Sequence, residues 1–283
     1  MKRTRRLTMG SVAVLLGAGL SVVGCGSDDG ATAAAGKSTT SAVSSTAAPT
    51  TTGASTGFCN SWRAVEEVTS QGPEGADDGP PSAAALSAFA TQIKAKLDPA
   101  ASAAPEAVAQ EIGDLKTIVD GVASGGDGSV LDPSNPKLGT PLSAVEAWTY
   151  DNCGWQQMPV DAVDYAFKGL PSSLKAGTSI IRLSNSSNTE AHMIALLRVN
   201  DTAKVTVDEL MAALESDPTA AEAKYGSDTT QMNGAFAEPG KVGYAVVDLK
   251  PGTYVGACFI PIGGTDGAPL HTTKGMVTSF VVT

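Results

Sequence analysis

Apolar residues recur at helical spacing between residues 58 and 154. Three runs show this period: Phe58, Trp62, Val65 and Val68; Leu86, Phe89, Ile93 and Leu97; and Val108, Ile112, Leu115, Val119 and Val122. Because residues three and four apart share one face of a helix, each run predicts an amphipathic helix. Residues 58–154 are therefore predicted to form a small helical bundle.

Capping residues set the expected ends of these helices. Ser82 is the predicted N-cap of the second helix, and Asp98-Pro99 its end, because the residue before proline disfavours helical geometry. Pro105 suits the first turn of the third helix. The capping box from Ser143 to Glu146 predicts the start of the fourth.

The residue pattern changes after Gly154, where runs of β-branched and aromatic residues are separated by Gly, Pro and Asn. Six segments are predicted strands: 160–168, 178–185, 191–199, 242–249, 252–260 and 275–282. Short strands separated by turns indicate a sandwich or barrel over residues 156–283. One helix is expected to interrupt them, opened by the capping box from Thr206 to Glu209 and ended by Asp217-Pro218.

The first 24 residues have the layout of a signal peptide. Four basic residues near the start precede an uncharged stretch that ends at Gly24, which is too short to span a bilayer stably. The run Val22-Val23-Gly24-Cys25 resembles the bacterial lipobox, which implies lipidation of Cys25 and anchoring to the extracytoplasmic face of the cell membrane. The alternative is an ordinary secretory signal followed by a chance cysteine.

Composition adds a tether and limits the partners. Residues 25–57 follow the signal peptide and are almost wholly Ser, Thr, Ala and Gly, which predicts a disordered tether. Without residues 1–24, which hold four Lys/Arg and no acid, 29 acidic residues face 15 basic ones, a formal charge of −14. This charge argues against nucleic acid or anionic lipid as a partner.

Four cysteines are present, and Cys25 is the predicted lipid attachment site. Cys59 opens the first predicted helix and Cys153 closes the last, so a disulfide between them would tie the ends of the bundle together. Cys258 is then left as a free thiol within a predicted strand.

Cys258 belongs to a spaced set of metal-binding residue types. The chain has two histidines, His192 and His271, both among the predicted strands. Twelve residues separate Cys258 from His271, and four more separate His271 from Met276. A thiolate and two imidazoles form a trigonal set that suits both Cu(I) and Cu(II), and a long axial thioether tunes the potential.

This order of residues resembles the cupredoxins, the blue copper proteins. In that family a ligand cysteine, a ligand histidine and a Gly-Met follow one another in the last two strands, with the first histidine on an upstream strand. The resemblance covers residues 156–283 and implies an antiparallel Greek-key β-sandwich within an α+β multidomain chain. It implies one type 1 copper ion bound by His192, Cys258, His271 and Met276, and an electron carrier with an unidentified redox protein partner.

The sequence departs from the cupredoxin pattern in two ways, and two functions other than electron transfer stay open. The loop between Cys258 and His271 is longer than in the small blue copper proteins, and Met193 replaces the polar residue that often follows the first histidine. A copper-free surface binding module and a copper carrier or buffer are the alternatives. The chain lacks the histidines for a trinuclear centre and the motifs of zinc proteases, serine hydrolases and nucleotide-binding enzymes, so a catalyst is not expected.

Overall fold

The computed structural model describes residues 53–74, 80–200, 205–216, 218–226, 234–265 and 267–283. The predicted signal peptide, Cys25 and the predicted tether up to residue 52 lie outside these residues. The tether prediction is wrong for residues 53–57, which form the start of a helix. Among the described helices, none is both long and apolar enough to cross a membrane.

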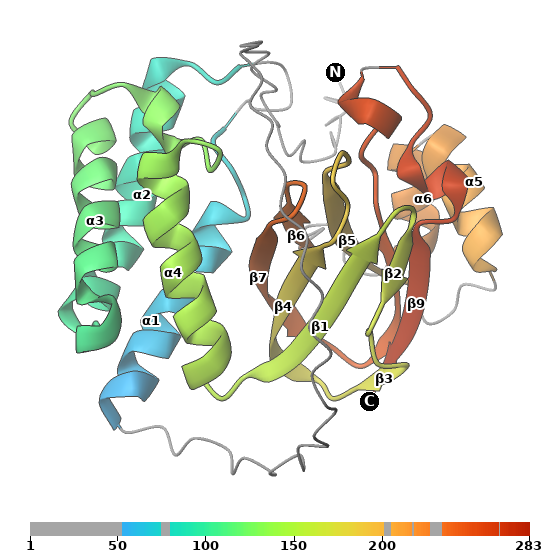
Figure 1. Cartoon of the computed structure of the whole chain (residues 1–283), viewed down its shortest axis with the longest axis horizontal. Coiled ribbons are helices and arrows are strands. Elements are labelled where there is room, and N and C mark those ends of the chain that lie inside the picture. The colour runs from blue at the N-terminus through green and yellow to red at the C-terminus, as the bar shows by residue number, and fades with distance from the viewer. Residues whose placement is uncertain (1–52, 75–79, 201–204, 217, 227–233, 266) are drawn as a thin grey trace, which may run out of the picture.

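The N-terminal part is a bundle of α-helices that lies beside the β-sandwich (Figure 1). Its helices are α1 (Gly53–Thr69), α2 (Ala83–Ser102), α3 (Ala109–Ala123) and α4 (Pro136–Asn152), with single turns at Glu106–Val108 and Gly128–Leu131. The apolar positions that predicted the helices lie in one core, where Phe58, Trp62 and Ile112 are fully buried. Burial of this shared face holds the helices together.

Two of the predicted helix ends are wrong. Ser82 caps α2 as expected, but the helix continues through Pro99 to Ser102. Pro99 lies three residues before the end of the helix, which continues past it without the hydrogen bond that a proline nitrogen cannot donate. The fourth helix begins at Pro136 and not at Ser143, because the Asn135 side chain accepts a hydrogen bond from the Lys137 N–H and proline suits the first helical turn.

The predicted disulfide is confirmed. Cys59 in α1 and Cys153, directly after α4, are bonded, with their Cα atoms 5.6 Å apart. The bond closes a loop of 94 residues and fixes the two terminal helices of the bundle against each other.

The C-terminal part is a sandwich of two mixed sheets. The first has the order β2-β1-β4-β7 and the second β3-β9-β8-β5-β6. The strands are β1 (Gln156–Val163), β2 (Ala166–Lys168), β3 (Ser173–Leu174), β4 (Gly177–Asn185), β5 (His192–Arg198), β6 (Gly234–Ala237), β7 (Val242–Leu249), β8 (Gly252–Ala257) and β9 (Val277–Val282). Their inward faces form one apolar core that includes Met158, Ile194 and Phe280.

The expectation of a wholly antiparallel sandwich is wrong at two strand pairs. β1 pairs with β4 and β3 with β9 in parallel. After β1 and β2 the chain crosses to the second sheet for β3 and then returns, so that β4 runs in the same direction as β1. The predicted strand 160–168 is in fact two strands, β1 and β2, joined by a tight turn at Asp164-Tyr165 in which Tyr165 has a φ of 62°.

The inserted segment contains two helices where one was predicted. The capping box is confirmed, since the Thr206 N–H donates to Glu209 Oε2 at 2.9 Å and the Glu209 N–H donates to Thr206 Oγ1 at 3.2 Å. After α5 (Val207–Ser216), Pro218 starts a second helix, α6 (Pro218–Tyr225). Proline ends one helix but is favourable at the first position of the next. Together the two helices cover the outer face of the second sheet at Leu197 and Val255.

Several side-chain contacts join the bundle to the first sheet. Arg63 in α1 forms an ion pair with Asp248 in β7 at 2.6 Å, and the rings of Tyr150 in α4 and Tyr244 in β7 lie 5.8 Å apart. Both strand residues are on the outer face of β7, so the bundle packs against the side of this sheet that faces away from the sandwich core.

Two carboxyl groups lie between α1 and α4. Glu66 is seven residues after Cys59, and Glu146 is seven before Cys153, so both lie about two turns from the disulfide. Burial raises the pKa of Glu66 from 4.5 to about 7. The Trp62 indole partly offsets this rise, although its Nε1 makes no hydrogen bond of good geometry. Burial and the neighbouring Glu66 charge raise the pKa of Glu146 well above its usual range.

We expect the stability of the chain to fall as the pH rises from about 4.5 through 7, because the raised folded-state pKa of Glu66 favours its neutral form. Glu66→Gln should remove part of this dependence and raise the free energy of unfolding at pH 8 by on the order of 2 kcal/mol, with little change at pH 4. Denaturant titrations at the two pH values measure both effects. The exposed neighbour provides the control: an equal gain in Glu67→Gln would contradict the account.

Candidate metal centre

Three of the predicted ligands converge in the sandwich. His192 Nδ1 and His271 Nδ1 are 3.2 Å apart, and Cys258 Sγ is 3.3 Å from His271 Nδ1. All three ligand atoms lie within 4.8 Å of one another. Among the described residues this is the one group of histidine, cysteine or acidic side chains placed to share a metal ion.

Strand pairing brings His192 and Cys258 together. β5 and β8 are antiparallel neighbours with Ala195 opposite Ala257, so the start of β5 lies beside the end of β8. His192 is the first residue of β5, and Cys258 directly follows β8. The β-sheet register therefore fixes the distance between these two side chains across 66 residues of sequence.

The loop after Cys258 returns His271 to the same place. Pro261 and Leu270 form an isolated antiparallel bridge across it, and the His271 N–H donates to the Ile260 carbonyl at 2.9 Å. His271 then opens the single helical turn His271–Lys274. This bracing explains how a loop of twelve residues still positions the histidine, so its length does not separate the ligands.

The three side chains are enclosed in the protein. His192, Cys258 and His271 each have 0% of their surface exposed. Burial lowers the pKa of both histidines; His271 lowers that of His192 further, whereas Glu190 acts in the opposite direction on His271. Both imidazoles are therefore neutral at neutral pH, the state in which histidine binds a metal.

Main-chain N–H groups surround the cysteine sulfur. Burial raises the pKa of Cys258, and the N–H groups of Met193 and Ile260 partly offset the rise; that of Met193 lies 3.4 Å from Sγ. Hydrogen bonds from N–H groups stabilise a thiolate. Met193 thus contributes through its backbone at the position where a polar side chain was expected.

Met276 lies in the same core as Cys258 and is fully buried. Its carbonyl accepts a hydrogen bond from the Cys258 N–H at 3.1 Å, and its N–H donates to the His271 carbonyl at 3.2 Å. Gly275 before it has a φ of 92°, a left-handed conformation that favours glycine. The backbone of Met276 is therefore bonded to both neighbouring ligand residues, and its role as an axial ligand stays a prediction.

The donor set fits a first-row transition metal. Two nitrogen atoms that are each about 2.0 Å from one ion lie roughly 3.2–3.5 Å apart, which agrees with the two Nδ1 atoms. Burial of three polar side chains in an apolar core costs free energy, which metal binding would offset. A thiolate with two imidazoles forms a set that suits both Cu(I) and Cu(II).

Two neighbours of His271 were missed at the level of sequence. Glu190 Oε2 is 3.4 Å from His271 Nε2, and the Tyr165 ring packs edge-on against the imidazole with centroids 5.1 Å apart. Glu190 is the one acid in an otherwise neutral Asn/Ser/Thr run before His192, which was its only sequence signal. Tyr165 gave none, because its contact depends on how the β1–β2 turn folds over the loop.

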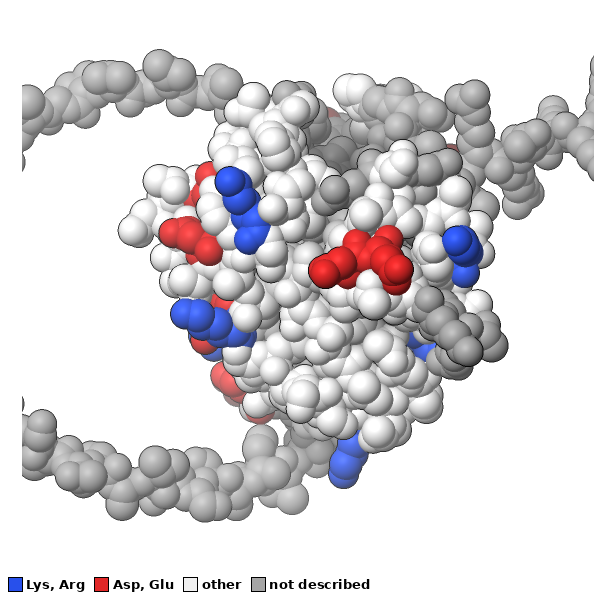
Figure 2. Space-filling model, turned by 90° about the vertical axis from the view of Figure 1, so that its right-hand side faces the viewer, with Lys and Arg blue, Asp and Glu red and all other residues white. Residues whose placement is uncertain are grey.

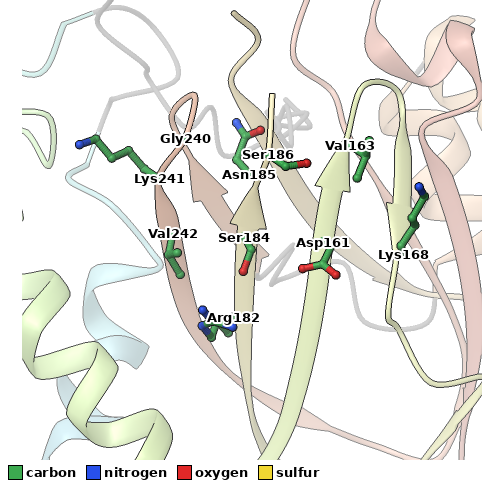
Figure 3. A pocket seen from close by; sticks show the side chains of 10 residues that line it. All are labelled: Asp161, Val163, Lys168, Arg182, Ser184, Asn185, Ser186, Gly240, Lys241 and Val242. Carbon is green, nitrogen blue, oxygen red and sulfur yellow. The ribbon is translucent and has the colours of Figure 1, made fainter. Parts of the chain in front are cut away.

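A separate hollow of about 430 Å³ lies on the outer face of the first sheet (Figure 3). Lys168, Arg182 and Lys241 line it together with a single acid, Asp161. Side chains alternate across a strand, so Arg182 points away from the core that holds its neighbours Ile181 and Leu183. None of the three converging ligands lines this hollow, so it is distinct from the candidate metal centre.

The face of the sandwich turned away from the bundle carries few charges. Figure 2 shows it as mostly uncharged surface, with a group of acidic side chains near the middle and both acidic and basic side chains toward the left edge of the view.

No protein-family model matches the chain, and no curated protein matches it. Among solved structures the chain is similar to auracyanin from the photosynthetic bacterium Roseiflexus castenholzii, with 18% identity and a TM-score of 0.31 over 45% of this chain and 97% of that one. It is also similar to auracyanin A, a blue copper protein from Chloroflexus aurantiacus, with 21% identity and a TM-score of 0.30 over 46% of this chain and 100% of that one. A third similar structure is rusticyanin from Thiobacillus ferrooxidans, with 17% identity and a TM-score of 0.28 over 45% of this chain and 76% of that one.

Proposed function

We propose that the chain is an electron carrier with one type 1 copper ion. The observation that carries this proposal is the convergence of His192, Cys258 and His271, fully buried and with all ligand atoms within 4.8 Å. Each residue comes from a different segment, and all three meet without any other described acid or histidine in the group. Such a set is suited to binding a metal ion.

The protein would contribute a rigid, dry donor set. Both histidines present Nδ1 to the shared space, and Cys258 presents its sulfur. Copper bound there would supply a one-electron couple between Cu(II) and Cu(I). Strand ends and the bridged loop hold the ligands in place, so their arrangement would change little between the two oxidation states.

The proposal includes attachment to the extracytoplasmic face of the cell membrane through lipidated Cys25. Its support is the lipobox-like run before Cys25 and the low-complexity stretch 25–57 that follows. Two acyl chains anchor a protein durably. A long tether would let the folded part exchange electrons with a redox protein partner near the membrane.

A copper carrier or buffer is the second candidate, because it would use the same ligands without a redox partner. A copper-free module is the third, since two imidazoles 3.2 Å apart and a thiol 3.3 Å away can also hydrogen-bond to one another. Copper titration distinguishes the copper-free module, which would not bind the ion, from the electron carrier and the copper buffer. Rapid electron exchange between the Cu(I) and Cu(II) forms is expected of an electron carrier and is not required of a copper buffer.

The test is addition of Cu(II) to the purified chain with Cys258 reduced. We expect one ion per chain and an intense visible charge-transfer band that disappears on reduction and returns on oxidation. No bound copper, or copper bound without the band, would contradict the proposal.

Met276→Leu tests the axial position. An axial thioether donates electron density to the ion and the apolar Leu side chain does not, so the replacement should keep the band but raise the reduction potential. We expect about a tenfold change in the ratio of the two copper affinities, or about 59 mV. Met158→Leu is the matched control, because Met158 is equally buried in the same core. Equal potentials in the two variants would exclude Met276 as a ligand.

A further inference from the structure

Glu190 links the candidate copper site to its surroundings. It lies in the loop between β4 and β5, and only 15% of its side chain is exposed. Its Oε1 and Oε2 accept from the Gly263 N–H at 3.2 and 3.0 Å. Oε1 is also 3.5 Å from the Tyr165 hydroxyl, and Oε2 is 3.4 Å from His271 Nε2. One carboxylate therefore contacts the Cys–His loop, the β1–β2 turn and a ligand imidazole.

The two nitrogens of His271 have different neighbours. Nδ1 faces Cys258 and His192, whereas Nε2 is buried and faces Glu190. Nε2 makes no hydrogen bond of good geometry, so Glu190 is the acceptor closest to making one. Metal binding through Nδ1 requires the proton on Nε2, and a carboxylate beside Nε2 favours that tautomer.

We propose that Glu190 is a positioning residue that orients His271 and lowers the reduction potential of the site. This inference rests on the copper-binding function proposed above. A carboxylate beside the far nitrogen raises the basicity of the imidazole, and its negative charge lies one ring away from the metal position. Both effects stabilise Cu(II) more than Cu(I).

A purely structural role makes a different prediction. If Glu190 only held the loop at Gly263, a neutral acceptor of the same shape would serve equally well. Glu190→Gln keeps one oxygen for the Gly263 N–H, removes the charge and replaces the second oxygen with an amide NH2 group. The reduction potential therefore separates the two roles, whereas thermal stability would not.

Asp164→Asn is the matched control. Asp164 is exposed, precedes Tyr165 in the same turn, and its charge acts on His192. It makes no direct contact with His271. Removal of its charge should have a small effect, because solvent and salt screen an exposed carboxylate.

The experiment compares the full chain with its Glu190→Gln, Glu190→Asp and Asp164→Asn variants, each loaded with Cu(II), by redox titration of the visible band. In Glu190→Gln the affinity ratio of Cu(II) to Cu(I) should fall about tenfold or more, which raises the potential by about 59 mV or more. The shifts in Glu190→Asp and Asp164→Asn should each be less than half as large. Glu190→Asp retains the charge and serves as a second variant should Glu190→Gln fold poorly.

A metal-free measurement gives an independent readout. Nitrogen-15 NMR of histidine should show His271 as the Nε2–H tautomer in the unsubstituted chain and as a mixture of tautomers in Glu190→Gln. Equal potentials in Glu190→Gln and Asp164→Asn, or an unchanged tautomer, would overturn the inference alone. Absence of the visible band in the unsubstituted chain would overturn the proposed function and the inference with it.

Discussion

Cys258→Ser is expected to abolish the visible band on addition of Cu(II) and to weaken copper binding by more than about a hundredfold. The band arises from charge transfer between a thiolate and Cu(II), and a hydroxyl does not replace the thiolate. Loss of residues that only support a ligand already costs about 10–100-fold in metal affinity, so loss of the ligand itself should exceed this. Absorption spectra and a competitive copper titration measure the two effects.

Burial of a new hydroxyl in the core could disturb the sandwich by itself. Ala257→Ser controls for this, because Ala257 is buried one residue before Cys258 and points to the opposite face of β8. That variant should keep the band. A band that survives in Cys258→Ser, or disappears in Ala257→Ser, would contradict the assignment of the sulfur as a copper ligand.

Removal of the disulfide should destabilise the helical bundle by about 4 kcal/mol without affecting copper. The bond closes a loop of 94 residues, and the chain-entropy model gives about 4–5 kcal/mol for loops of this length. The change is the double variant Cys59→Ser, Cys153→Ser. Denaturant unfolding followed by tryptophan fluorescence reports on it, since Trp62 and Trp148 pack in the bundle core.

The predicted copper ligands lie in the other part of the chain, so the visible band of this double variant should match that of the unsubstituted chain. Cys258→Ser, which keeps the disulfide, should leave the bundle transition in place. A stability loss below about 1 kcal/mol would indicate that the unfolded chain is hardly restricted by the bond. Loss of the band would indicate that the bundle supports the metal centre.

Local patterns were sufficient to predict much of the bundle and the three residues that converge at the candidate metal centre. The 3.6-residue period placed Ile112, Val119 and Val122 in the core, and the positions of Cys59 and Cys153 predicted their bond. His192, Cys258 and His271 could be selected because the chain has so few histidines and free cysteines. His192 lies far from Cys258 and His271 in the sequence, so no short motif links it to them. It could be selected only because the chain has two histidines.

Predictions from the sequence failed for features that depend on long-range packing. Strand direction cannot be read from apolar alternation, so the parallel β1–β4 pair was not anticipated. Proline was interpreted as a terminator at Pro99, although it lies within a helix, and the second helix that begins at Pro218 was not anticipated. The contacts of Glu190 and Tyr165 with His271 come from three separate loops that meet only in the folded chain.

Copper K-edge X-ray absorption of the Cu(II)-loaded chain tests the central claim most directly. The account predicts one copper ion per chain with two imidazole nitrogens and one short bond to sulfur, from His192, His271 and Cys258. A first coordination shell of nitrogen and oxygen alone would contradict it, because the ion would then be bound away from the buried cysteine.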